Sequence, residues 1–247
     1  MNSILKQFVL AFFLSSTVIA PCFADLTEQE LIRAGTSYLK MNLLDQAIEN
    51  YNKAAALNPR SETAFYALGK AYFLKGDQAR AEAAYNQSLS LNPNYALGYL
   101  GRGALYLTRN DLVPALADLD RSISLDPEND DAYYDRASIY STQKEYDKAI
   151  ADYTKAIELK NDRKDAYINR GFMYIVKTDY EKALADLNAV IRMDDQYAVG
   201  YVYRAQYYIQ VKDYDHAWDD VKKARSLGYN VPANLVEILR KVSGREE

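Results

Sequence analysis

The sequence repeats itself with a period of 34 residues. Pro59, Pro93 and Pro127 are spaced by this interval, and the next two steps reach Asn161 and Asp195, which also favour turns. Three further columns keep the same register: Ala47, Ala81, Ala115, Ala149, Ala183 and Ala217; Tyr38, Tyr72, Tyr106, Tyr140, Tyr174 and Tyr208; and Gly35, Gly69, Gly103, Ala137, Gly171 and Ala205. A period of this length predicts an array of like units stacked side by side.

The composition favours helices within each unit. Only 10 Gly and 6 Pro occur among 247 residues, which is too few turn formers for a typical all-β chain. Tyrosine is overused, with 23 Tyr against 7 Phe, and this excess indicates one structural position that is filled many times. The formal net charge of -4 argues against a dedicated nucleic-acid binder, which needs a positive field.

The fourth unit, residues 130–163, shows the pattern most fully. It reads DDAYYDRASIYSTQKEYDKAIADYTKAIELKNDR, and its pattern residues are Tyr133, Ala137, Tyr140, Ala149, Tyr153 and Ala156. This pattern resembles the tetratricopeptide repeat (TPR) family. The resemblance implies an all-α solenoid, in which antiparallel helix pairs wind into a right-handed superhelix with the first helix of each pair lining the inner face.

We expect a repeat domain over residues 25–231, followed by a capping helix and short tail over residues 232–247. The six TPR-like repeats are placed at 28–61, 62–95, 96–129, 130–163, 164–197 and 198–231. Within each repeat, helix A should occupy roughly the first 14 residues and helix B roughly the next 14. An apolar stripe in the last segment is expected to cover the open end of repeat six. The stripe is Leu235, Ile238, Leu239 and Val242.

Turn signals fall between the two expected helices of most repeats. The aspartates at these turns can each cap helix B through the side-chain oxygen. They are Asp77, Asp111, Asp179 and Asp213. Pro114 falls in the first turn of its helix, where its missing N–H is expected to cost little.

Two charged columns occur together in repeats three to six. Position 7 of these repeats holds Arg102, Arg136, Arg170 and Arg204, and position 23 holds Asp118, Asp152, Asp186 and Asp220. Repeats one and two lack both charges. Because positions 7 and 23 lie nearly opposite in an antiparallel hairpin, we predict four Arg–Asp pairs, each within its own repeat. The alternative is recent duplication, in which the two columns are inherited together without touching.

The inner face of the solenoid is the expected site of binding. The candidate groove residues are Tyr66, Lys70, Phe73, Leu100, Leu107, Tyr134, Ile168, Asn169, Phe172 and Ile175. Most are apolar or aromatic, so an extended peptide or an amphipathic helix could lie there. The alternative is that some of them only pack between neighbouring A helices. Asp131, Asp135 and Asp165 indicate a locally acidic inner wall, which would favour a basic partner segment or would simply be a solvated patch.

The sequence offers little for catalysis or metal binding. There is one His, His216, and one Cys, Cys22, whereas a zinc site usually takes four ligands. We therefore expect no catalytic residue, no cofactor and no metal. The expected function is a non-enzymatic protein–protein interaction scaffold or assembly factor. Its partner is expected to be a protein or peptide, not a nucleic acid or a small-molecule substrate.

Residues 1–24 have the pattern of a secretory signal peptide. Lys6 precedes an apolar run from Phe8 to Ala20, and small residues precede a predicted cleavage site after Ala24. This pattern predicts an exported protein, either periplasmic or secreted. Two alternatives remain: a retained anchor, or a lipid on Cys22. Only these two would bring the chain to a membrane, and the second would make it a membrane-tethered lipoprotein chaperone or pilot for an envelope assembly.

Overall fold

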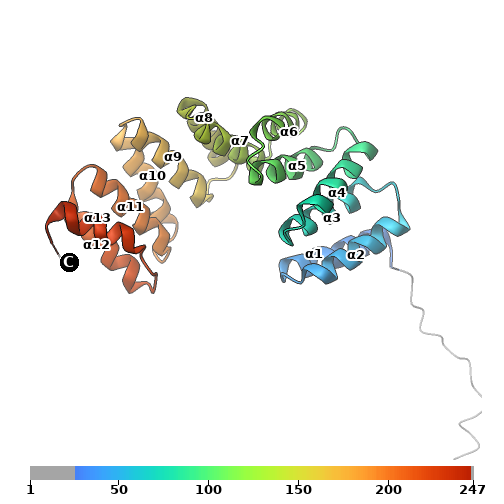
Figure 1. The fold of residues 1–247 in the computed structure, drawn as a ribbon, viewed down its shortest axis with the longest axis horizontal. Helices are drawn as coiled ribbons and strands as arrows, with labels where there is room; N and C mark the ends of the chain where they lie inside the picture. Colours follow the sequence, from blue (N-terminus) through green and yellow to red (C-terminus); the bar gives the residue numbers. More distant parts are fainter. Residues whose placement is uncertain (1–25, 246–247) are drawn as a thin grey trace, which may run out of the picture.

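The computed structural model describes residues 26–245, which form thirteen α-helices and no strand (Figure 1). The helices are α1 (Glu28–Lys40), α2 (Leu44–Leu57), α3 (Glu62–Leu74), α4 (Gln78–Leu91), α5 (Ala96–Thr108), α6 (Leu112–Leu125), α7 (Asp130–Thr142), α8 (Tyr146–Leu159), α9 (Lys164–Val176), α10 (Tyr180–Met193), α11 (Ala198–Gln210), α12 (Tyr214–Ser226) and α13 (Ala233–Ser243). The expected all-α fold is confirmed. The predicted signal peptide and Cys22 lie outside the described residues.

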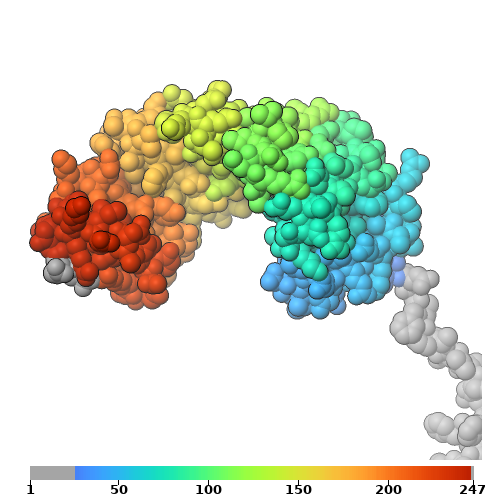
Figure 2. All heavy atoms as spheres, viewed as in Figure 1, coloured from blue at the N-terminus to red at the C-terminus, as the bar shows by residue number. Residues whose placement is uncertain are grey.

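The helices pair along the chain and curve into an arch. Each odd-numbered helix from α1 to α11 packs most extensively against the helix that follows it, and these hairpins stack in sequence order. Figure 1 shows α1 and α2 at one end of the arch and α11 to α13 at the other, and Figure 2 shows the wide concavity between the two ends. Neighbouring A helices, apart from α7 and α9, also pack against one another, which places the A helices on the inside of the curve.

The turn between helices A and B has the same backbone conformation in all six repeats. The fifteenth residue of each repeat has a positive φ, between 57° and 81°. These residues are Asn42, Gly76, Asn110, Lys144, Thr178 and Lys212. Gly and Asn adopt this left-handed conformation most readily, whereas the β-branched Thr178 is strained there.

Aspartate caps form at three of the four predicted places. The side chains of Asp77, Asp179 and Asp213 each accept a hydrogen bond from the backbone N–H three residues later. Asp111 makes no such bond, so this part of the prediction is wrong. The reason is that the third residue after Asp111 is Pro114, which has no N–H to donate.

The closest contacts between helices A and B use small residues. The alanine column is fully buried in every repeat, with 0% exposure. Tyr51 and Tyr85, each 1% exposed, press their rings against the glycines opposite them in helix A. A Cβ built on Gly35 would lie 2.5 Å from Cε1 of Tyr51, and one built on Gly69 would lie 2.5 Å from Cδ1 of Tyr85. Glycine is therefore required at these two positions by space.

The four predicted Arg–Asp pairs are all present as two-point contacts. The Nε–Oδ2 and Nη2–Oδ1 distances are 2.7 and 2.9 Å for Arg102–Asp118, 2.7 and 2.8 Å for Arg136–Asp152, 2.9 and 2.7 Å for Arg170–Asp186, and 2.8 and 2.7 Å for Arg204–Asp220. The four aspartates are buried. Contact, rather than shared ancestry alone, therefore explains why the two columns occur together.

The same arginines also join each repeat to the one before it. The Nη1 atom of each donates to position 25 of the preceding repeat. The acceptors are Asn86 for Arg102, Asp120 for Arg136, Thr154 for Arg170 and Asn188 for Arg204. Each guanidinium also lies between two tyrosine rings, as Arg136 does between Tyr133 at 5.6 Å and Tyr140 at 5.9 Å. In repeats three to six, the tyrosine column that includes Tyr140 is half-buried beside these cations.

Helix α13 closes the C-terminal end of the array, but with a different apolar face from the one expected. Leu235, Val236 and Leu239 are buried against α11 and α12. Ile238 and Val242 are 48% and 43% exposed, so their place in the predicted stripe is wrong. The reason is that the buried face of α13 is centred between residues 235 and 239 and includes Val236.

Candidate functional site

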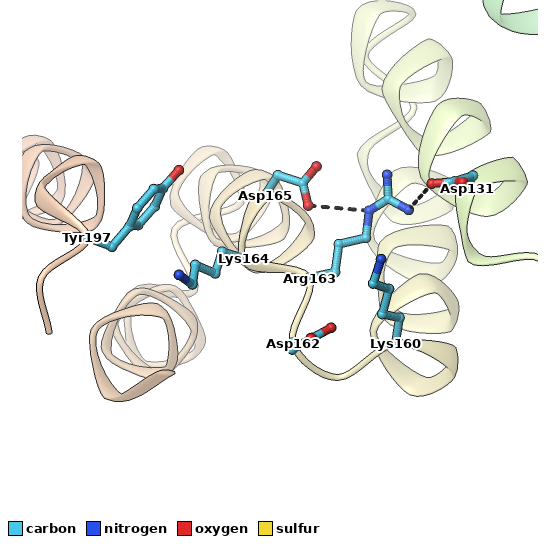
Figure 3. A pocket seen from close by; sticks show the side chains of 7 residues that line it. All are labelled: Asp131, Lys160, Asp162, Arg163, Lys164, Asp165 and Tyr197. Carbon is cyan, nitrogen blue, oxygen red and sulfur yellow. Dashed lines mark hydrogen bonds and ion pairs between the residues drawn. The ribbon is translucent and has the colours of Figure 1, made fainter. Parts of the chain in front are cut away.

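One hollow lies beside the α8–α9 connection, at the junction of repeats four and five, and is lined mainly by charged residues (Figure 3). Its volume is about 510 Å³, and its lining is Asp131, Lys160, Asp162, Arg163, Lys164, Asp165 and Tyr197. We call it the charged hollow. Figure 3 shows the guanidinium of Arg163 reaching between Asp131 and Asp165.

Arg163 holds the charged hollow together. Its Nη1 lies 2.6 Å from Oδ2 of Asp130 and 2.6 Å from Oδ1 of Asp131, and its Nε lies 3.3 Å from Oδ1 of Asp165. Its guanidinium also stacks 4.0 Å from the ring centroid of Tyr134. Arg163 thus pairs with the carboxylates of both neighbouring helices, and these ion pairs join α7 to α9. Arg163 was not predicted from the sequence, since it is the last residue of its repeat and belongs to no column.

The second hollow lies between α7 and α9 and is lined mainly by aromatic and small polar side chains. Its volume is about 330 Å³, and its lining is Ser138, Ser141, Tyr153, Asn169, Phe172, Met173 and Tyr203. We call it the aromatic hollow. Its walls come from α7, α8, α9 and α11. Among neighbouring A helices, α7 and α9 are the least closely packed, which leaves room for this opening.

Hydrogen bonds and ring contacts hold the aromatic hollow in shape. Asn169 donates from Nδ2 to the hydroxyl of Tyr134, at 3.0 Å, and this bond bridges α7 and α9. The ring of Phe172 meets that of Tyr203 edge-on, with centroids 6.2 Å apart. Phe172 remains 38% exposed, so it presents apolar surface to a partner.

The ten predicted groove residues do not all reach the groove. Asn169 and Phe172 line the aromatic hollow, and Tyr134 bonds to Asn169 at its edge. Leu100 and Ile168 are 9% and 4% exposed, so they pack between helices and are not available to a partner. The remaining five do not line the aromatic hollow: Tyr66, Phe73, Leu107 and Ile175 are half-buried and pack against core clusters, and Lys70 is exposed.

The acidic wall expected from the sequence exists, but Arg163 neutralises part of it. Asp135 lies beside Asp131, Asp165 and Arg163, and it receives no hydrogen bond from any residue between 26 and 245. Burial, together with repulsion from Asp131 and Asp165, raises the pKa of Asp135 to about 7, although Arg163 opposes this effect. Asp135 is therefore a carboxyl group that lacks a local cation of its own.

Nothing in the described part of the chain gathers metal ligands or spans a bilayer. Residues 26–245 contain no group of three or more His, Cys, Asp or Glu side chains that could hold a metal ion. None of their helices is both long and apolar enough to cross a membrane.

Comparison with protein families finds TPR sequence profiles along most of the repeat domain. The matches, all described as TPR or tetratricopeptide repeat, cover residues 35–76, 63–95, 103–170 and 164–197. Among curated proteins, no sequence matches this chain.

Several solved structures share this architecture. A chain of the APC/C hetero-tetramer Cut9–Hcn1 superposes with a TM-score of 0.76 at 17% identity, covering 87% of this chain and 43% of that one. YrrB, a TPR protein with an unusual peptide-binding site, superposes with a TM-score of 0.62 at 18% identity, covering 79% of this chain and 98% of YrrB. PilF of Pseudomonas aeruginosa gives 0.74 at 16% identity, covering 88% and 96%. This chain thus spans less than half of the first match, and identities this low show the fold alone.

Proposed function

The chain belongs to the tetratricopeptide repeat family, and on that premise we propose that it is a non-enzymatic interaction scaffold that binds a peptide or helical segment of another protein in its concave groove. The observation that carries this proposal is the aromatic hollow between α7 and α9. It joins exposed apolar surface, at Phe172, to a hydrogen-bonding amide, at Asn169. Peptide sites combine these two features, since apolar pockets anchor side chains and polar groups fix the register of the backbone.

The experiment is a pull-down with the chain lacking residues 1–24 as bait. Wild type is compared with the double variant Tyr134→Ala and Phe172→Ala, which removes an aromatic anchor and the hydroxyl that orients Asn169. We expect the double variant to recover at least about tenfold less partner, because truncating a central aromatic anchor typically costs at least about 1.4 kcal/mol.

A matched control uses an apolar residue on the outer face. Val113, in helix B of repeat three, is 79% exposed and far from the hollow, so Val113→Ala should recover the same partners as wild type. Circular dichroism establishes that all variants keep the helical fold. Equal recovery by wild type and the double variant would place the binding surface outside the concave groove.

We also propose that the protein acts outside the cytoplasm. The support is the signal-like sequence of residues 1–24, which lies outside the described residues. Mass spectrometry of the N-terminus of the mature protein tests this proposal. A free Asp25 is the expected result, and an acylated Cys22 would favour the membrane-tethered alternative. An intact Met1 on protein in the membrane fraction would favour the retained anchor, whereas an intact Met1 on protein in the cytoplasmic fraction would contradict the proposal.

A further inference from the structure

We propose that the groove at repeats four and five selects a partner segment in which a lysine or arginine lies within two residues of a bulky apolar side chain. This inference rests on the proposed function, because it names the chemistry of the segment held in the same groove. The occupant is an extended stretch of another protein. It is identified by two adjacent features of the groove, one apolar and one acidic.

The apolar feature is the aromatic hollow. Phe172 and Tyr203 form one side of it, and Tyr153 and Met173 form its floor. Ser138 lies at its edge on α7, and its hydroxyl lies 3.2 Å from that of Tyr153. A side chain the size of leucine or phenylalanine fits a hollow of about 330 Å³ and would cover the exposed part of Phe172.

The acidic feature is the group of carboxylates next to the hollow. Above about pH 7, where Asp135 is mostly ionised, Asp131, Asp135 and Asp165 bring three negative charges to this part of the chain, and Arg163 brings one positive charge that is already shared with Asp130. A net negative charge therefore remains at this point of the groove. Asp135 is its centre, since no described residue donates a hydrogen bond to it and its side chain is only half-buried, so a partner can reach it.

The spacing of the two features sets the spacing in the partner. Asp135 and Ser138 are three residues apart on α7, which corresponds to about 4.5 Å of helix rise. An extended chain advances about 3.3 Å per residue, so neighbouring features of the groove are reached by side chains one or two residues apart. A basic residue at this separation would place its charge beside Asp135 while the apolar side chain fills the hollow.

The negative charge is a local property of the groove and not of the whole inner face. Arg33 and Lys70, at inward positions of α1 and α3, are exposed and carry the opposite sign. The inner positions of repeat three are uncharged. A basic side chain would therefore be attracted to repeats four and five and repelled from repeats one and two, which fixes where the segment lies.

The test uses two pools of short synthetic peptides that differ at one position. Both pools carry a fixed phenylalanine among Ala, Ser and Gly, and the second residue after it is lysine in one pool and glutamate in the other. Binding to the chain without residues 1–24 is measured by fluorescence anisotropy at about pH 8, where Asp135 is mostly ionised. We expect the lysine pool to bind about tenfold more tightly than the glutamate pool, and this preference to weaken as salt is raised.

Two variants locate the source of the preference. Asp135→Asn keeps the shape of the side chain and should abolish the preference. Asp111→Asn removes an exposed carboxylate at the α5–α6 turn, where the side chain makes no capping bond, and should leave the preference intact. Equal binding of both pools, binding of neither pool, or a preference that survives Asp135→Asn would each overturn the inference.

A third variant separates this inference from the proposed function. Phe172→Ala should weaken both pools to a similar extent, because it removes the apolar wall that both fixed phenylalanines contact. If that loss is seen without any lysine preference, the groove binds peptides and only the charge selection is wrong. If Phe172→Ala changes neither the affinity for the two peptide pools nor the recovery of partners in the pull-down, the proposal that the groove binds peptides is itself wrong.

Discussion

At the scale of single residues, the glycines opposite the buried tyrosines are fixed by space and not by backbone conformation. Gly69 is helical, and its absent Cβ leaves room for the ring of Tyr85, which would otherwise lie 2.5 Å away. Gly171 occupies the same column, but a Cβ there would meet atoms at 3.5 Å or more, which is ordinary contact. The same residue type thus has different constraints in repeats two and five.

We therefore expect opposite effects from the same substitution at these two glycines. Gly69→Ala should lower the free energy of unfolding by about 1–3 kcal/mol, because Tyr85 is buried and its ring has little freedom to move. Gly171→Ala should raise it by up to about 1 kcal/mol, since alanine is a better helix former than glycine. Urea unfolding followed by circular dichroism measures both, and equal effects at the two sites would contradict this account.

The carboxyl group of Asp135 gives a second prediction, on pH. Its pKa in the folded chain is about 7 against an ordinary 3.8, so the folded state holds a proton that the unfolded state has lost. This group therefore costs progressively more stability as pH rises from about 4 to about 7. The groups facing it are Asp131, Asp165, Arg163 and, from α8, Tyr153.

Asp135→Asn should remove that cost. We expect the variant to be about 2 kcal/mol more stable than wild type near pH 8 and similar to wild type near pH 4, because only the charged form of Asp135 is penalised. Thermal melts of the two proteins across this pH range give the comparison. A difference in melting temperature that stays constant at all pH values would mean that ionisation of Asp135 is not the cause of the lower stability of wild type.

At the scale of helices, α6 shows how two favourable local signals can cancel. Asp111 occupies the N-cap position and Pro114 lies in the first turn, and each is a good choice by itself. Together they leave the helix without a side-chain cap, because Pro114 has no N–H to donate to the carboxylate of Asp111. The equivalent aspartate at α10, Asp179, accepts its bond from Lys182 N–H at 3.4 Å.

A double-mutant cycle at α6 tests this explanation. In wild type, Asp111→Ala should change stability by less than about 0.5 kcal/mol, because the side chain makes no capping bond. In the Pro114→Ala background, the same change should cost about 1 kcal/mol, because alanine supplies the missing N–H and the cap can form. The cycle removes the separate effect of proline on the unfolded chain. An equal cost in both backgrounds would contradict the explanation.

The helices and their pairing were predictable from the sequence because the same local pattern occurs in all six repeats. The four Arg–Asp pairs were also predictable, since two columns that appear together in an antiparallel hairpin have few ways to avoid contact. The residues that are exposed in the groove were harder to predict. Leu100 and Ile168 share a helix position with Tyr134, yet both are buried, because each belongs to a core cluster formed with side chains of neighbouring helices, which the repeat pattern does not specify.

At the scale of the whole molecule, each repeat is stabilised by contacts with its neighbours in the array. The arginines of repeats three to six each bond to the preceding repeat, whereas repeats one and two have Ala34 and Leu68 in place of this residue. Helix α13 protects the other end, where Trp218 donates to Ser243 at 3.2 Å and Arg245 pairs with Asp215. The effect of a substitution on stability can therefore reach a distant repeat only through the repeats that lie between them.

A cavity in α13 should consequently have a local effect. Leu239 is 0% exposed, so Leu239→Ala should destabilise its surroundings by about 2–5 kcal/mol. Because each repeat contacts only its neighbours, hydrogen exchange measured by mass spectrometry should rise in α11, α12 and α13 and stay unchanged in α1 to α4. Ile238→Ala, at an adjacent but 48% exposed residue, is the matched control and should change exchange little anywhere. If Leu239→Ala instead raised exchange equally in all thirteen described helices, the array would unfold as one cooperative block, and the nearest-neighbour account of its stability would be wrong.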